Sequence, residues 1–223
     1  MREDRDNHAG ASAEREYERR QAARRERAGE RYGPLGGLAA NWIGDPNVEA
    51  WARGAAGEQQ TARALAKHLR GSDVIVIHDR RIPGRGRANI DHIAIGPAGI
   101  TVIDTKSTRG NVEITTPLLS RHDVLRVNGH DRTRQLDAIE RQIDAVRRAL
   151  ERSGTGVIPI TGALCYPFMR RRCLHRSRAR GGLITVDQPR QIARRARRRG
   201  PLTPRDIGVL AAILERALPP AGA

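Results

Sequence analysis

Apolar residues recur every three to four positions in four stretches of the chain, and this spacing predicts helices. The stretches lie at residues 47–70, 132–152, 190–199 and 204–218. An Asp-Pro pair at residues 45 and 46 favours a helix start just after it.

Short apolar runs bounded by Gly, Pro, Asn or Asp predict strands between these helices. They lie at residues 73–78, 90–95, 100–106, 112–115, 124–127, 157–166 and 183–186. Residues 96–99 (GPAG) have the composition of a turn, so the second and third strands are predicted to form a hairpin. Helices that alternate with strands indicate an α/β fold, with a sheet covered by helices.

The first 46 residues lack this periodicity, because they are mostly charged or small and carry no apolar stripe. We therefore predict that residues 1–46 form a charged N-terminal extension, disordered or loosely helical, with a Gly/Pro-rich linker. The folded domain is predicted to span residues 47–218, and residues 219–223 are predicted to be a short tail.

Composition narrows the class of protein. Hydrophobic residues make up 38% of the 223 residues and aromatic residues 3%, so the core must come from Ile, Leu, Val and Ala. Two cysteines are too few for a disulfide framework or a zinc finger. No run approaches 18 apolar residues and the first residues are charged, so we expect a cytoplasmic protein without a membrane partner. Residues 83–86 (PGRG) lack the GK[ST] ending of a phosphate-binding loop, so no nucleotide cofactor is expected.

Positive charge is concentrated in the last third of the domain. The formal net charge is +16, and residues 170–199 hold twelve arginines against one acid, Asp187, a net charge of +11. Such a field attracts polyanions, nucleic acid first of all. The alternative is a composition biased towards arginine, with charges that are merely solvated.

Two acids are predicted to face each other in the hairpin. If the turn pairs Ile95 with Ile100, the register places Asp91 opposite Asp104, with Cβ atoms roughly 5 Å apart. Carboxylates this close on a half-buried surface repel each other, and loss of hydration adds to the cost. A divalent cation between them reverses the sign of the interaction, and oxygen ligands suit Mg²⁺ or Mn²⁺. A slipped register, which would separate the two acids, is the alternative.

Two further residues, Lys106 and Glu58, are predicted to lie near the two acids of the hairpin. Lys106 follows Asp104 by two positions and therefore shares its face of the sheet. It is one of two lysines among forty-one basic residues, which hints at a property that arginine lacks. Glu58 falls on the apolar stripe of the first helix. Taken alone it is a half-exposed edge position, but with the hairpin it becomes a third acid aimed at the sheet.

Four segments of the sequence closely resemble the nuclease-related domain family, NERD, which is assigned to the restriction-endonuclease-like PD-(D/E)xK superfamily. They are residues 54–58 (GAAGE), 78–84 (HDRRIPG), 88–95 (ANIDHIAI) and 96–106 (GPAGITVIDTK). The resemblance is dense over residues 50–110 and thinner to about residue 150, so the motif core is placed at residues 50–150. It implies a restriction-endonuclease-like mixed sheet flanked by helices. Ile90 stands where the superfamily has a proline, which supplies no chemistry there.

The resemblance implies a metal-dependent nuclease that hydrolyses phosphodiester bonds, with DNA as the expected substrate. Asp91 and Asp104 would ligate Mg²⁺ or Mn²⁺, the carbonyl of Thr105 would add a ligand, and Glu58 would ligate through water or hold the base in place. Lys106 would orient or help to deprotonate the attacking water and would stabilise the developing charge.

The remaining expected site residues follow from the same resemblance and from the charge pattern. Gln135, early in the helix after the sheet, corresponds to a glutamine found there in related nucleases. The arginines expected to contact phosphate are Arg80, Arg81, Arg85 and Arg87 in the loop beside the site, and Arg170, Arg171, Arg172, Arg194 and Arg195 in the basic segment.

Two other functions stay open from the sequence. The first is a catalytically weak or inactive member of the same family that binds nucleic acid as an adaptor. The second is a basic structural protein of the nucleoid or ribosome, in which the motif is a coincidence.

Overall fold

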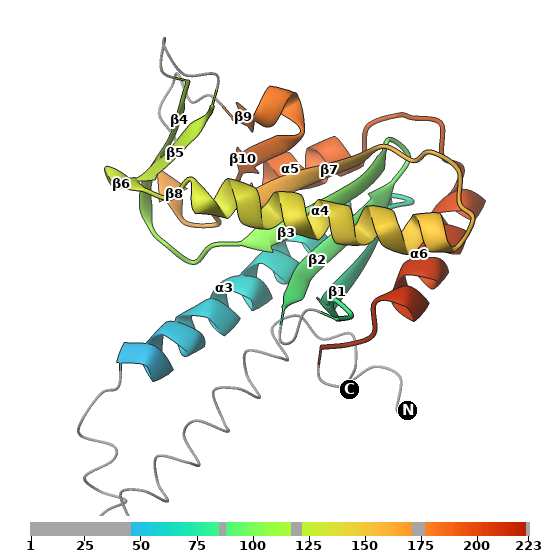
Figure 1. Cartoon of the computed structure of the whole chain (residues 1–223), viewed down its shortest axis with the longest axis horizontal. Helices are drawn as coiled ribbons and strands as arrows, with labels where there is room; N and C mark the ends of the chain where they lie inside the picture. Colours follow the sequence, from blue (N-terminus) through green and yellow to red (C-terminus); the bar gives the residue numbers. More distant parts are fainter. Residues whose placement is uncertain (1–45, 85–87, 117–121, 171–176, 222–223) are drawn as a thin grey trace, which may run out of the picture.

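The computed structural model describes residues 46–84, 88–116, 122–170 and 177–221, with side chains in the first helix from Gly54 onward (Figure 1). The predicted N-terminal extension therefore lies outside the described residues, apart from its last position. Among the helices of the described part, none is long and apolar enough to cross a membrane.

A six-stranded mixed sheet forms the centre of the domain (Figure 1). Three antiparallel strands at one side continue into parallel strands, and a short antiparallel strand closes the other side. A parallel pair needs a crossover connection, and helix α4 lies in the connection between β3 and β7. The order is β1 (Ile75–Arg81), β2 (Asn89–Gly96), β3 (Gly99–Thr105), β7 (Ile160–Cys165), β10 (Ile184–Asp187) and β9 (Arg178–Ala179).

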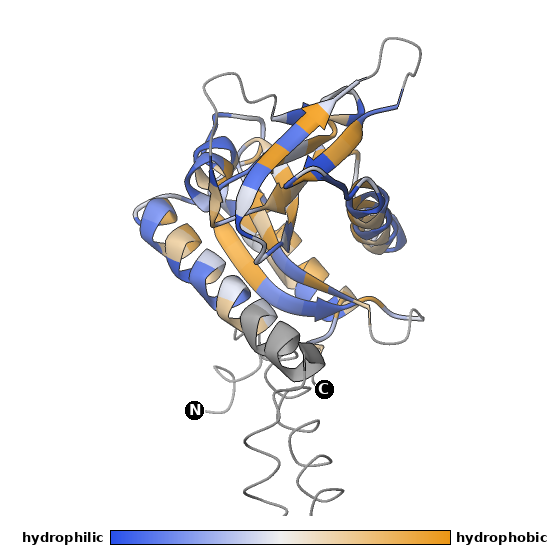
Figure 2. Cartoon of the chain, turned by 90° about the vertical axis from the view of Figure 1, so that its left-hand side faces the viewer, coloured by the Kyte–Doolittle hydropathy of each residue, from blue (hydrophilic) through white to orange (hydrophobic). Residues whose placement is uncertain are grey.

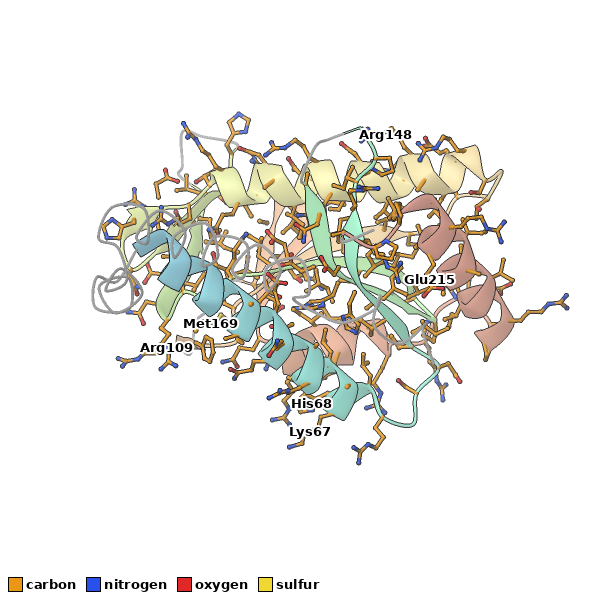
Figure 3. The ribbon with its side chains drawn as sticks, turned by 90° about the horizontal axis from the view of Figure 1, so that it is seen from below. Lys67, His68, Arg109, Arg148, Met169 and Glu215 are labelled. Atoms are coloured by element: carbon orange, nitrogen blue, oxygen red, sulfur yellow. The ribbon has the colours of Figure 1, made fainter. Side chains whose placement is uncertain are left out.

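Helices cover both faces of this sheet, and Figure 3 shows strands lying between α4 and α3. Helices α4 (Arg134–Arg152) and α6 (Pro204–Ala217) pack on the face that carries Ile93 and Val102, in the larger apolar cluster. Helices α3 (Pro46–Leu69) and α5 (Pro189–Ala196) pack on the opposite face, against Ala94 and Ile103. Figure 2 shows strongly hydrophobic colours concentrated in the strands between these helices. The predicted mixed α/β fold flanked by helices is confirmed.

A second, four-stranded sheet begins shortly after β3 ends. Its order is β6 (His130–Asp131), β5 (Val124–Val127), β4 (Gly110–Thr115) and β8 (Met169–Arg170). Strands β4 and β5 were predicted, whereas β6, β8, β9 and the 3-10 helix η2 (Arg180–Gly182) were not, because two- or three-residue elements leave no periodic signal.

The first strand ends later than predicted, and this corrects the placement of two arginines. Strand β1 runs through Arg80 and Arg81, which pair with residues of β2, so neither arginine lies in the predicted loop. Residues 219–221 hydrogen-bond to β1 from its other side, with Arg81 N–H donating to the Pro219 carbonyl at 2.8 Å. The predicted tail thus covers the edge of the sheet, and this pairing extends a strand whose sequence is polar.

Candidate metal and catalytic site

The hairpin of β2 and β3 has the predicted register, with Ile95 opposite Ile100 and Ile93 opposite Val102. One step beyond the last pair, the same register sets Asp91 opposite Asp104. The backbone N–H of Thr105 donates to Asp91 Oδ2 at 2.7 Å, which ties the first acid to the end of β3. The slipped register is therefore wrong, and the two acids lie on neighbouring strand ends.

Both acids are almost removed from water, since Asp91 is 8% exposed and Asp104 5%. Burial raises the pKa of Asp91 well above its usual range, and the negative charges of Glu58 and Asp104 raise it further. Lys106 and the hydrogen bond from Thr105 only partly oppose this rise. An ionised Asp91 is therefore costly unless a positive charge is added beside it.

Lys106 supplies the positive charge next to these acids. Its Nζ donates to Asp104 Oδ1 at 2.9 Å and lies 2.8 Å from Oδ2. The second oxygen is buried but not aligned for a hydrogen bond, so it keeps an unused lone pair. Burial alone would lower the pKa of Lys106, but Asp104, Asp91 and Glu58 outweigh burial and raise it. Lys106 is therefore an ammonium at neutral pH, suited to stabilise negative charge rather than to accept a proton.

Glu58 is the third acid of this cluster. It lies one turn before Thr61, a buried α3 residue whose hydroxyl is 3.7 Å from Cys165 Sγ at the end of β7. Its Oε2 is buried and has no hydrogen-bond partner among the described residues. Burial raises the pKa of Glu58 to about 7, with Asp79 and Asp104 adding to the rise and Lys106 opposing it. If all three acids ionise, three negative charges face one ammonium.

A glycine allows α3 to approach this cluster. A Cβ added at Gly57 would lie 3.0 Å from Ser107 Cβ, directly after Lys106, whereas a Cβ added at Gly54 would meet nothing within 4 Å. The close contact at Gly57 holds the helix that carries Glu58 against the end of β3.

Replacing Gly57 with valine is expected to lower the free energy of unfolding by about 1–3 kcal/mol, because the added methyls overpack this contact. Gly54→Val is the matched control in the same helix, and it is expected to leave stability unchanged or slightly raised, because valine forms helix better than glycine. Urea denaturation followed by circular dichroism measures both variants. Equal effects at the two positions would show that the contact of Gly57 with Ser107 is not tight.

Asp79 is an acid near the site that the sequence analysis missed. The pairs His78–His92 and Arg80–Ile90 set it opposite Asp91, and it is 1% exposed. Its φ of 49° is left-handed, a conformation uncommon outside glycine, asparagine and aspartate. The strand was predicted to end one residue before it, and extending the β1–β2 pairing through residue 81 would have revealed it.

The model of the nuclease-related domain family matches residues 53–167, just over half of the chain. The chain belongs to the NERD family. The match spans the acid cluster, Lys106 and Gln135, and it ends before α5 and α6. Searches of curated proteins and of solved structures gave no match. The NERD domain indicates a nuclease-related function.

Gln135, another expected site residue in the NERD domain, is hydrogen-bonded to Tyr166. It lies in the first turn of α4, and its Oε1 accepts a hydrogen bond from the hydroxyl of Tyr166. Burial raises the pKa of Tyr166, and the charge of Asp104 adds to this, so the tyrosine lies within the field of the cluster. The described hydrogen bonds thus connect Gln135 to Tyr166. Tyr166 was not predicted as a site residue, because an aromatic residue at a strand end is usually part of the core.

The arginines expected to contact phosphate beside the NERD site differ in burial and in their partners. Arg80 is buried, and its Nη2 lies 3.6 Å from Glu215 Oε1, so it belongs to the packing of α6 on β1 and we withdraw it as a phosphate contact. Arg81 is half-buried at the end of β1. Arg85 and Arg87 lie outside the described residues.

The arginines of the C-terminal segment also differ in their exposure and in their pairing with acids. Arg170 in β8 and Arg194 in α5 are exposed. Arg195 instead donates to Asp187 Oδ2 at 2.7 Å, a carboxylate that is fully buried, so part of its charge is compensated. Arg171 and Arg172 lie outside the described residues.

An arginine and an aromatic ring lie together near the start of the second sheet. The guanidinium carbon of Arg109 is 4.7 Å from the ring centre of Phe168, which is partly exposed. Figure 3 labels Arg109 and Met169 at the end of the molecule where α3 begins, whereas Lys67 and His68 mark the other end of that helix. This pair was not predicted from the sequence, because the pairing of β4 with β8 brings its two segments together.

The donors of the cluster suit a hard divalent cation. No group of three or more His, Cys, Asp or Glu side chains in the described ranges forms a ready-made metal cage. Mg²⁺ does not need one, because it usually keeps several waters and binds through one or two carboxylates. Asp91 and Asp104 would provide that pair if a metal binds, and Glu58 Oε2, which has no hydrogen-bond partner among the described residues, would accept from a metal-bound water.

Proposed function

We propose that this NERD protein is a metal-dependent nuclease that hydrolyses phosphodiester bonds of DNA with Mg²⁺ or Mn²⁺. One observation carries the proposal: the buried Asp91 and Asp104 lie with the partly buried Glu58 in a group with excess negative charge, and Lys106 is the ammonium beside it. The mutual repulsion of the three acids and the burial of two of them cost the fold stability unless a positive charge is added. A cation and a phosphate group would make use of all four residues.

Asp91 and Asp104 would hold the metal with the carbonyl of Thr105, and Glu58 would bind a water of the metal's shell. When bound, the metal supplies Lewis-acid polarisation of the phosphate and a water of lowered pKa. Thr105 has a second part in this arrangement, because its N–H fixes the orientation of the Asp91 carboxylate.

Lys106 would stabilise the negative charge that develops on the phosphate oxygens during hydrolysis. Its ammonium already lies 2.8 and 2.9 Å from the two oxygens of Asp104, so it is held at the cluster before substrate binds. A preorganised charge costs little reorganisation during the reaction. Gln135, held by Tyr166, would position the phosphate backbone beside the cluster.

Asp104→Asn tests the function directly. We expect the wild type to convert supercoiled plasmid to nicked or linear DNA with Mg²⁺ and not with EDTA. The variant should be slower by at least about 10- to 100-fold, the range typical of losing an outer-shell partner of a metal site. Asp144→Asn is the control, because Asp144 is a partly exposed α4 residue that pairs with Arg147 at 2.5 Å and lies outside the acid cluster. If the wild type binds DNA in a salt-sensitive way but does not cleave it, the nuclease proposal is wrong and the protein is a nucleic-acid-binding adaptor of the same family.

A further inference from the structure

A pocket of about 340 Å³ lies far from the acid cluster along the same sheet. Its floor includes Thr101 at the start of β3, and α5 forms one wall through Ile192 and Ala196. From Thr101 to Lys106 an extended chain covers roughly 16 Å, since each strand residue advances about 3.3 Å. The pocket is therefore a separate feature from the metal site.

The lining of this pocket is positive. Arg178, Arg195 and Arg198 contribute to it, and none of the residues that line it is acidic. Arg195 donates a hydrogen bond to Asp187, a residue that does not line the pocket, so part of its charge is compensated. Arg178 and Arg198 are exposed, and no acidic residue of the described ranges pairs with either of them. Two guanidinium groups are thus available at the mouth of a concave site.

Hydroxyl groups complete the polar surface. Thr101, Thr161 and Thr185 come from the three adjacent parallel strands β3, β7 and β10, and all three line the pocket. The hydroxyl oxygens of Thr101 and Thr161 are 3.4 Å apart. Guanidinium and hydroxyl donors are the groups that proteins use to bind phosphate oxygens, and here no carboxylate lines the pocket beside them.

We propose that this pocket binds a phosphate group, carried either by a free nucleotide or by the terminal phosphate of a nucleic acid strand. The volume lies at the lower end of the range for small-molecule sites and suits a group of about nucleotide size. The proposal does not depend on nuclease activity, because none of the residues that carry it belongs to the acid cluster.

The test is calorimetric titration of pyrophosphate into the full chain, with EDTA present so that no metal–pyrophosphate complex forms. Arg178→Gln with Arg198→Gln is expected to weaken binding at least tenfold. Arg205→Gln with Arg216→Gln removes the same charge from exposed positions on α6 and is expected to leave the affinity within twofold. Thr161→Val removes one hydroxyl at constant charge and is expected to weaken binding several-fold.

Equal weakening by the two double variants, or no binding of pyrophosphate to the wild type, would overturn the proposal. Competition by a mononucleotide supports the pocket and identifies a free ligand. Competition by a 5′-phosphorylated oligonucleotide, but not by its 5′-hydroxyl form, supports the pocket and identifies a strand end. Asp104→Asn should bind pyrophosphate as the wild type does, so loss of nuclease activity and loss of this site are separate results.

Discussion

Lys106→Met is expected to lower the rate of plasmid cleavage by roughly 10²- to 10³-fold, the effect typical of losing one preorganised donor in an active site. Methionine keeps the unbranched apolar stem and removes the ammonium. The negative charges of Glu58, Asp91 and Asp104 then lose the group that opposes them. Affinity for Mg²⁺ should therefore stay equal or rise while cleavage falls.

Lys67→Met is the matched control, since Lys67 is the other lysine of the chain and lies exposed near the end of α3 (Figure 3). The substitution removes the same charge and should leave cleavage within twofold. Single-turnover cleavage and calorimetric titration of Mg²⁺ separate the two effects at position 106. Cleavage by Lys106→Met at the wild-type rate would show that the ammonium only stabilises the fold.

The part of the site that the sequence predicts is the part set by local geometry. A four-residue turn between two apolar runs determines the register, and the register alone places Asp91 opposite Asp104. The two-residue period then puts Lys106 on the same face. These inferences need no knowledge of other elements. The observed pairing confirms the register, and the hydrogen bond from Lys106 to Asp104 at 2.9 Å is consistent with the second inference.

The residues that were missed or misplaced depend on contacts between distant segments. Arg80 looks like a loop cation in the sequence, but pairing with β2 and the approach of residues 219–221 bury it beside Glu215. Tyr166 reaches Gln135 only because α4 crosses back over the sheet. The raised pKa of Glu58 likewise requires α3 to pack against the end of β3, which depends on the absence of a side chain at Gly57.

Without metal, the protein is expected to lose stability as the pH rises from about 4.5 to about 7, and Glu58→Gln should remove much of this loss. The folded state holds the proton of Glu58 up to a pKa of about 7, whereas an unperturbed glutamate has a pKa of 4.5. Between these values the folded state binds more protons than the unfolded state, so the free energy of unfolding falls with pH. The expected loss is on the order of 1–3 kcal/mol, and Asp91 acts in the same direction.

Urea denaturation in EDTA at pH 4.5, 6 and 8 measures this slope, with Glu151→Gln as the control because Glu151 is exposed on α4. The difference between Glu58→Gln and the wild type should grow through this window and then level off. Added Mg²⁺ should stabilise the wild type more at pH 8 than at pH 4.5, because protons and metal compete for the same carboxylates. A pH-independent difference would mean that Glu58 ionises freely, and the buried oxygen of its side chain would then not be held ready for a metal-bound water.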